Sequence, residues 1–164
     1  MLARLRPLWP LVTLAFSGVT LAIAILYFQN TLGLSPCPLC LDQRNWHWGV
    51  IGVSVLAFVL MRFKPGWSQW AVMVVGLVLL GSAAMGMYHV AVEQHWVIAQ
   101  CDARIDLDDI RPMDFSQGET FEVPKCDEIA WQMWGVSMAG WNAIASLLMA
   151  LLTFGVAAAR EPKL

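Results

Sequence analysis

Four cysteines are the residues of this sequence best suited to chemistry, and they form two pairs of different spacing. Cys37 and Cys40 belong to a Cys-Pro-Leu-Cys motif, whereas 24 residues lie between Cys101 and Cys126. At a helix N-terminus, two thiols three residues apart lie on one face, where the helix dipole and unpaired N–H groups stabilise a thiolate. Because the thiolate is the nucleophile of disulfide exchange, the Cys-Pro-Leu-Cys motif predicts a redox-active dithiol.

Two other interpretations of the cysteines stay open. A disulfide across a four-residue loop removes little chain entropy, so Cys37–Cys40 is a poor structural staple. A structural zinc site takes four ligands at short spacing, and the wide separation of Cys101 and Cys126 does not match it, so we predict no metal site. The simplest disulfide pairing is Cys37–Cys40 and Cys101–Cys126, although four cysteines allow three connectivities and the sequence does not choose among them.

The composition determines which class of protein positions these cysteines. Of the 164 residues, 59% are hydrophobic and 13% are charged, against roughly 45–50% and about 25% in soluble globular proteins. So few charges cannot cover the surface of a soluble monomer of this size. With only 10 lysines and arginines and a net charge of −2, a nucleic-acid binder is excluded as well. A small multi-pass membrane protein remains.

Long stretches without charged residues locate the membrane spans. A helix needs about 20 apolar residues to cross the hydrocarbon core, and four long gaps between charged residues predict helices over 8–28, 41–61, 67–90 and 131–157. The second gap, between Arg44 and Arg62, holds only 17 residues, so this helix is expected to begin upstream of Arg44. Segments 29–40 and 91–130 then form two loops on one side of the membrane, and each carries one cysteine pair. We therefore predict an all-α, integral-membrane four-helix bundle that comprises residues 1–164 as a single domain.

The distribution of basic residues predicts the orientation of this bundle. The two termini and the short turn between the second and third helices carry six of the ten basic residues, whereas loop 91–130 holds ten of the twelve acidic ones. By the positive-inside rule, both termini are cytoplasmic and both cysteine loops lie on the outer side of the membrane. A cleaved signal peptide at the N-terminus is the competing interpretation, but the apolar run continues through 25–28 and is long enough to span.

Arg44 falls within the first turns of the second predicted helix. It is either a snorkelling anchor or a functional group, since ionisable residues inside a membrane are costly. The dithiol at the membrane surface is within reach of a lipid-soluble partner, and the cysteines of the acidic loop are within reach of a soluble one. Together the two pairs predict a two-stage redox relay across the boundary between water and membrane.

The sequence resembles the DsbB family, the quinone-dependent thiol oxidases of the bacterial inner membrane. The resemblance covers nearly the whole chain, with four spans, two outer loops and two cysteine pairs in the same order. The most specific stretches are the Cys-Pro-Leu-Cys motif followed by Gln43-Arg44, and Cys126-Asp127-Glu128 leading into residues 135–142.

The resemblance implies a path for electrons. A periplasmic thiol oxidase of the DsbA type would attack the Cys101–Cys126 disulfide, with Cys101 carrying the mixed disulfide. Exchange would then pass the electrons to Cys37–Cys40, and Cys40 would deliver them to a bound ubiquinone or menaquinone from the membrane pool.

The resemblance also implies that Arg44 and His89 bind the quinone, whereas His47 and His95 are assigned no role. Two other functions stay open. One is a membrane thiol reductase of the vitamin K epoxide reductase type, which also couples loop cysteines to a quinone. The other is a non-enzymatic membrane scaffold held by structural disulfides.

Overall fold

The computed structural model describes residues 2–98 and 125–159, and most of this part of the chain is helical. Four long helices dominate it: α1 (Trp9–Ala22), α2 (Pro38–Phe63), α3 (Ser68–Glu93) and α4 (Met138–Ala158). A 3₁₀ segment, η1 (Leu2–Leu8), precedes α1, a π-helix, η2 (Ile23–Thr31), continues it, and a short 3₁₀ turn, η3 (Pro65–Trp67), joins α2 to α3. Four helical stretches are long and apolar enough to cross a membrane, which confirms the predicted all-α four-helix architecture.

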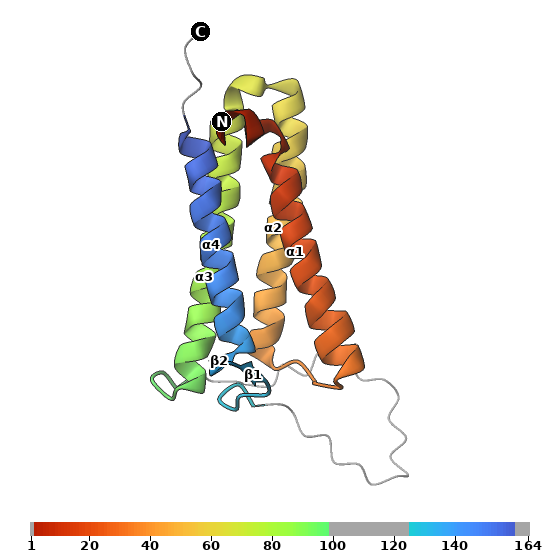
Figure 1. Ribbon diagram of the computed structural model, residues 1–164, viewed down its shortest axis with the longest axis vertical. Coiled ribbons are helices and arrows are strands. Elements are labelled where there is room, and N and C mark those ends of the chain that lie inside the picture. The colour runs from red at the N-terminus through yellow and green to blue at the C-terminus, as the bar shows by residue number, and fades with distance from the viewer. Residues whose placement is uncertain (1, 99–124, 160–164) are drawn as a thin grey trace.

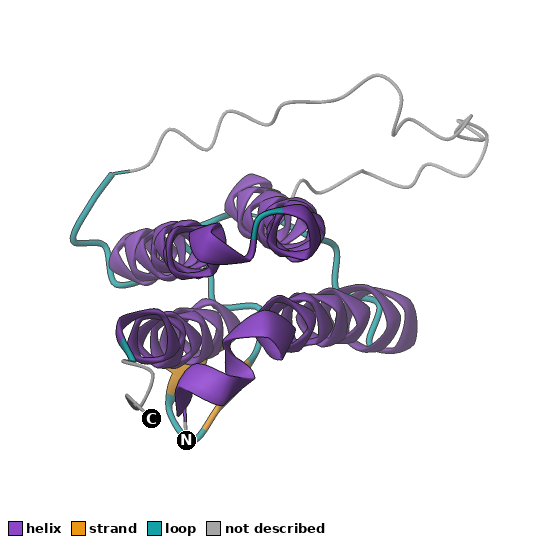
Figure 2. Cartoon of the chain, turned by 90° about the horizontal axis from the view of Figure 1, so that it is seen from above, coloured by secondary structure: helices purple, strands orange, loops and turns teal. Residues whose placement is uncertain are grey.

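Each helix runs in the direction opposite to the one before it in the chain (Figure 1). Viewed along the bundle they form two rows (Figure 2). The start of α1, the turn between α2 and α3, and the end of α4 lie at one end. The beginning of α2, the end of α3 and the two short strands lie at the opposite end. The first cysteine pair therefore meets the last turns of α3.

Small residues bring α3 and α4 together. A Cβ built on Gly86 would lie 3.0 Å from the backbone of Ala143, so only glycine permits this approach without a shift of one helix. Close backbone approach through small residues is a common way for membrane helices to associate. It brings the polar side chains of α4 within reach of those on α2 and α3.

The fourth helix begins later than predicted. The sequence indicated a helix from residue 131, but residues 132–137 form a hairpin of strands β1 (Gln132–Met133) and β2 (Val136–Ser137). Its two central residues, Trp134 and Gly135, have φ angles of 52° and 78°, as the tight two-residue turns of β-hairpins require. Ser137 then caps α4, because its Oγ accepts a hydrogen bond from the Gly140 N–H at 3.2 Å.

The second helix begins earlier than predicted, at Pro38 rather than at residue 41. Proline suits the first turn of a helix, where its missing N–H would have no intrahelical partner. As a result, Cys40 lies inside the first turn of α2 and Cys37 stands immediately before it.

Candidate functional site

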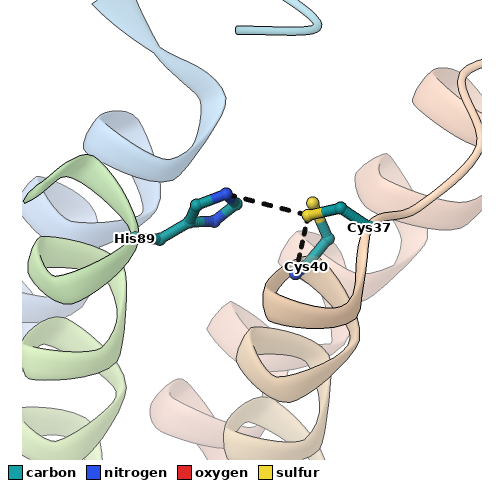
Figure 3. A group of neighbouring side chains, drawn as sticks. All are labelled: Cys37, Cys40 and His89. Carbon is teal, nitrogen blue, oxygen red and sulfur yellow. Dashed lines mark hydrogen bonds between the residues drawn. The ribbon is translucent and has the colours of Figure 1, made fainter. Parts of the chain in front are cut away.

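The first cysteine pair forms the N-terminal cap of α2. Cys37 occupies the capping position, and its Sγ accepts a hydrogen bond from the Cys40 N–H at 3.2 Å. Cys37 is buried, whereas Cys40 is partly exposed. Both are free thiols, so the structure presents the reduced form of the pair (Figure 3). The Cys37–Cys40 disulfide stays a prediction about the oxidised form.

His89, near the end of α3, faces this pair (Figure 3). Its Nε2 lies 3.7 Å from the Sγ of Cys37. The contact with the Cys40 thiol, and secondly burial, raise the pKa of the Cys37 thiol above its ordinary value. Cys37 therefore keeps its proton more firmly than an exposed cysteine does, and both the Cys40 thiol and the His89 imidazole lie beside it.

A hydrogen-bonded row of polar side chains, the polar chain, holds the Nδ1 side of the His89 imidazole. His89 Nδ1 is hydrogen-bonded to the Gln43 amide, and the Asn142 Nδ2 donates to the Gln43 Oε1 at 2.8 Å. The Asn142 Oδ1 is in turn 2.8 Å from His47 Nε2, and His47 Nδ1 lies 3.3 Å from the Ser17 Oγ. This polar chain takes at least one residue from each of the four long helices. It holds the His89 ring with Nε2 toward the sulfur atoms.

Arg44 connects the first turns of α2 to the π-helical end of α1. One guanidinium nitrogen donates to the Gln29 Oε1 at 2.8 Å, and the other terminal nitrogen donates to the Ala24 carbonyl at 3.1 Å. Arg44 is thus held by two hydrogen bonds in one geometry.

A cavity of about 410 Å³ opens beside these residues. Cys37, Cys40, Arg44 and His89 all line it. Much of the remaining wall is apolar and includes Leu21, Ile23, Ala24, Phe28, Leu34 and Trp131. An apolar cavity with a few convergent polar groups is the usual form of a small-molecule site.

Cys126 lies at the same end of the bundle. Its side chain is buried and packs with Cys37, Leu39 and Val92, and its backbone interacts with His89. Cys126 is disulfide-bonded. Cys101 lies outside the described residues, so the predicted Cys101–Cys126 pairing stays a prediction. One member of the second pair thus belongs to the same buried cluster as a member of the first pair.

Sequence reasoning did not assign a role to several residues of this site. Gln43 follows Cys40 by three residues and Glu93 follows His89 by four, so each shares a helix face with a residue that had been identified. A polar or ionisable residue at such a position within an apolar span is the feature of the sequence that could have identified both residues. Glu93 is buried, and its Oε1 lies 3.9 Å from His89 Nε2.

The two histidines that were assigned no role have different surroundings. His47 is buried within the polar chain between Ser17 and Asn142. His95 lies beyond the end of α3, where its Nδ1 is 3.1 Å from the Glu93 carbonyl oxygen.

Comparison with known proteins agrees with this arrangement. The family profile described as "Disulfide bond formation protein DsbB" matches residues 6–156. A disulfide bond formation protein B from Marinobacter nauticus is 32% identical over 156 residues, which cover 90% of this chain and 88% of the relative. The namesakes from Idiomarina loihiensis (31% identical; 90% of this chain and 81% of the relative) and Haemophilus ducreyi (30%; 89% and 82%) are similar to it as well.

No solved structure matches the chain with significance. The profile nevertheless covers all four long helices, the Cys-Pro-Leu-Cys motif and both Cys101 and Cys126. Together with four helices able to span a membrane, these matches show that the chain belongs to the DsbB family of disulfide bond formation proteins and is a multi-pass membrane oxidoreductase.

Proposed function

We propose that the protein reoxidises a periplasmic dithiol oxidase of the DsbA type and passes the electrons through its two cysteine pairs to a membrane quinone. The observation that carries this proposal is the grouping of cysteines at one end of the bundle. Cys126 and Cys37 belong to one buried cluster, and Cys40, the partner of Cys37, lines an apolar cavity together with Arg44. This grouping supports transfer from the second pair to the first and from the first pair to an acceptor in the cavity.

The exchange steps balance without any further reagent. A partner thiolate attacks Cys101 of the Cys101–Cys126 disulfide, and the second partner thiol then resolves the mixed disulfide, leaving the partner oxidised. The released Cys126 thiolate attacks Cys37 of the Cys37–Cys40 disulfide. Attack of Cys101 on Cys126 restores the outer disulfide and leaves Cys37 and Cys40 as a dithiol. That dithiol is the state seen in the structure.

Three residues would hold the electron acceptor. Cys40, Arg44 and His89 line the same cavity, where the guanidinium can donate hydrogen bonds to a ring oxygen and His89 Nε2 can transfer a proton. A bound ubiquinone or menaquinone would supply the capacity to accept two electrons and two protons. With the Gln43 amide rotated so that its oxygen accepts from the Nδ1–H, His89 Nε2 would also accept the Cys37 proton across the 3.7 Å contact.

Turnover with purified components tests this function. The detergent-solubilised protein is mixed anaerobically with a reduced DsbA-type partner and either quinone. We expect one quinone to be reduced for each pair of partner thiols lost. The absorbance of the quinone measures its reduction, and titration of the thiols measures their loss. Omission of the partner, or of this protein, is the control. Absence of quinone reduction with both quinones would overturn the proposal.

The proposed route also fixes the orientation of the chain. We expect both termini in the cytoplasm and both cysteine loops in the periplasm, because basic residues collect at the opposite end from the loops. A reporter that is active only outside the cytoplasm should be silent when fused after Leu164 and active when inserted within 104–117. The reverse pattern would place all four thiols in the cytoplasm and exclude the periplasmic partner.

A further inference from the structure

The reduced cysteine pair lies among other groups that bind metal ions. Cys37 Sγ, Cys40 Sγ and a ring nitrogen of His89 lie within 4.8 Å of one another (Figure 3). Zinc–sulfur and zinc–nitrogen bonds of about 2.3 and about 2.0 Å put two ligand atoms of a tetrahedral site about 3.5 Å apart. The distance between Cys37 Sγ and His89 Nε2 is 3.7 Å, so these two atoms already stand nearly as far apart as two ligands of one tetrahedral zinc ion.

Glu93 stands one turn after His89 on α3 and is the candidate for a fourth ligand. Its Oε1 is 3.9 Å from His89 Nε2, and the side chain is only 6% exposed. Its other oxygen, Oε2, is buried without a hydrogen-bond partner in the described part of the chain. A buried carboxylate oxygen left unpaired is costly, and coordination of a cation would satisfy it.

The charges of such a site balance. Two thiolates and the Glu93 carboxylate carry three negative charges, and a divalent cation neutralises two of them. Arg44 supplies the third positive charge, since its guanidinium interacts electrostatically with both Cys40 and Cys37. Burial of charge is tolerated when the charges are paired in this way.

The surroundings of His89 also suit a metal ligand. Metal-bound histidines donate their second ring N–H to a neighbouring acceptor, which fixes the tautomer. His89 Nδ1 is hydrogen-bonded to the Gln43 amide, and rotation of that amide presents its oxygen as the acceptor. The neighbouring Asn142 amide can rotate in the same way, so the chain to α4 stays intact.

We propose that the reduced protein binds one Zn²⁺ through Cys37, Cys40, His89 and Glu93. Each thiol releases its proton to solvent on binding, and no electrons are transferred. Because the metal occupies both sulfur atoms, it holds the pair reduced and competes with formation of the Cys37–Cys40 disulfide. The wide separation of Cys101 and Cys126 does not match a zinc site, but His89 and Glu93 of α3 offer a second pair of ligands beside Cys37 and Cys40.

The test measures metal binding and not turnover. The full-length protein with Cys101→Ser and Cys126→Ser, which leaves one cysteine pair, is purified in detergent, reduced with a phosphine and titrated with Zn²⁺ against a chromogenic chelator. We expect one Zn²⁺ per reduced chain and none after oxidation of the pair. Co²⁺ should give a thiolate charge-transfer band and the intense d–d absorption of four-coordinate cobalt.

Two ligand variants and two matched controls decide the outcome. His89→Asn and Glu93→Gln should each weaken Zn²⁺ binding at least about tenfold and alter the cobalt spectrum. His95→Asn and Glu128→Gln, which change the same residue types outside the cluster, should leave both unchanged. Equal affinity in all four variants, or no four-coordinate cobalt spectrum, would overturn the zinc site. Either result leaves the quinone assay unaffected, so the two proposals fail separately.

Discussion

Replacement of Cys40 by serine is expected to abolish quinone reduction while the helical fold persists. A hydroxyl cannot exchange with a disulfide, so steady-state turnover should fall at least about 10³-fold. The helix cap should survive, because the Cys40 group that binds Cys37 Sγ is the backbone N–H and not the side chain. Turnover of purified Cys40→Ser with reduced partner and quinone measures the first effect, and thermal unfolding measures the second.

The same variant separates the two halves of the proposed relay. Cys40→Ser retains Cys101 and Cys126, so it should still oxidise about one equivalent of partner dithiol in a single turnover and then stop. Cys37→Ser should also lose quinone reduction, because it removes the sulfur that Cys126 attacks in the proposed exchange, so the Cys37–Cys126 disulfide cannot form. Sustained turnover by Cys40→Ser would show that the electrons leave by another route.

Charge-free stretches predicted the four helices because charged side chains are excluded from the hydrocarbon core, and this constraint acts on the sequence directly. The same signal could not show where α4 begins. Residues 132–137 carry no charge, so the stretch resembled part of a span. The hairpin depends on the positive φ angles of Trp134 and Gly135, and only one of these two residues is a glycine.

The cysteine pairs, Arg44 and His89 could be predicted because a local motif or a family resemblance identified them. The polar chain through Gln43 and Asn142 could not, because these two residues meet only when α2 and α4 are correctly rotated. Helices that are apolar on nearly every side give little indication of which face points inward. That rotation is set by close packing such as Gly86 against Ala143.

Replacement of Arg44 by alanine is expected to impair the quinone step much more than replacement by lysine. The guanidinium donates to the Gln29 side chain and the Ala24 carbonyl from two different nitrogens, and a single ammonium cannot reproduce this fork. Arg44→Lys keeps the positive charge near Cys40 and should raise the apparent KM for quinone while retaining some turnover. Arg44→Ala should lose about 2–4 kcal/mol of transition-state stabilisation, the scale of one preorganised electrostatic donor.

Quinone kinetics of the purified variants measure this difference, and Arg62→Ala is the matched control. Arg62 lies at the other end of α2, where its guanidinium stands 5.6 Å from the centre of the Phe58 ring, so its loss should leave kcat and KM for quinone unchanged. Disulfide exchange between the partner and Cys101–Cys126 should be equally fast in all of these proteins, because that step takes place before the cavity is involved. If Arg44→Ala reduced quinone as well as Arg62→Ala does, Arg44 would be an interfacial anchor, and its hydrogen bonds to η2 would serve only to join α1 to α2.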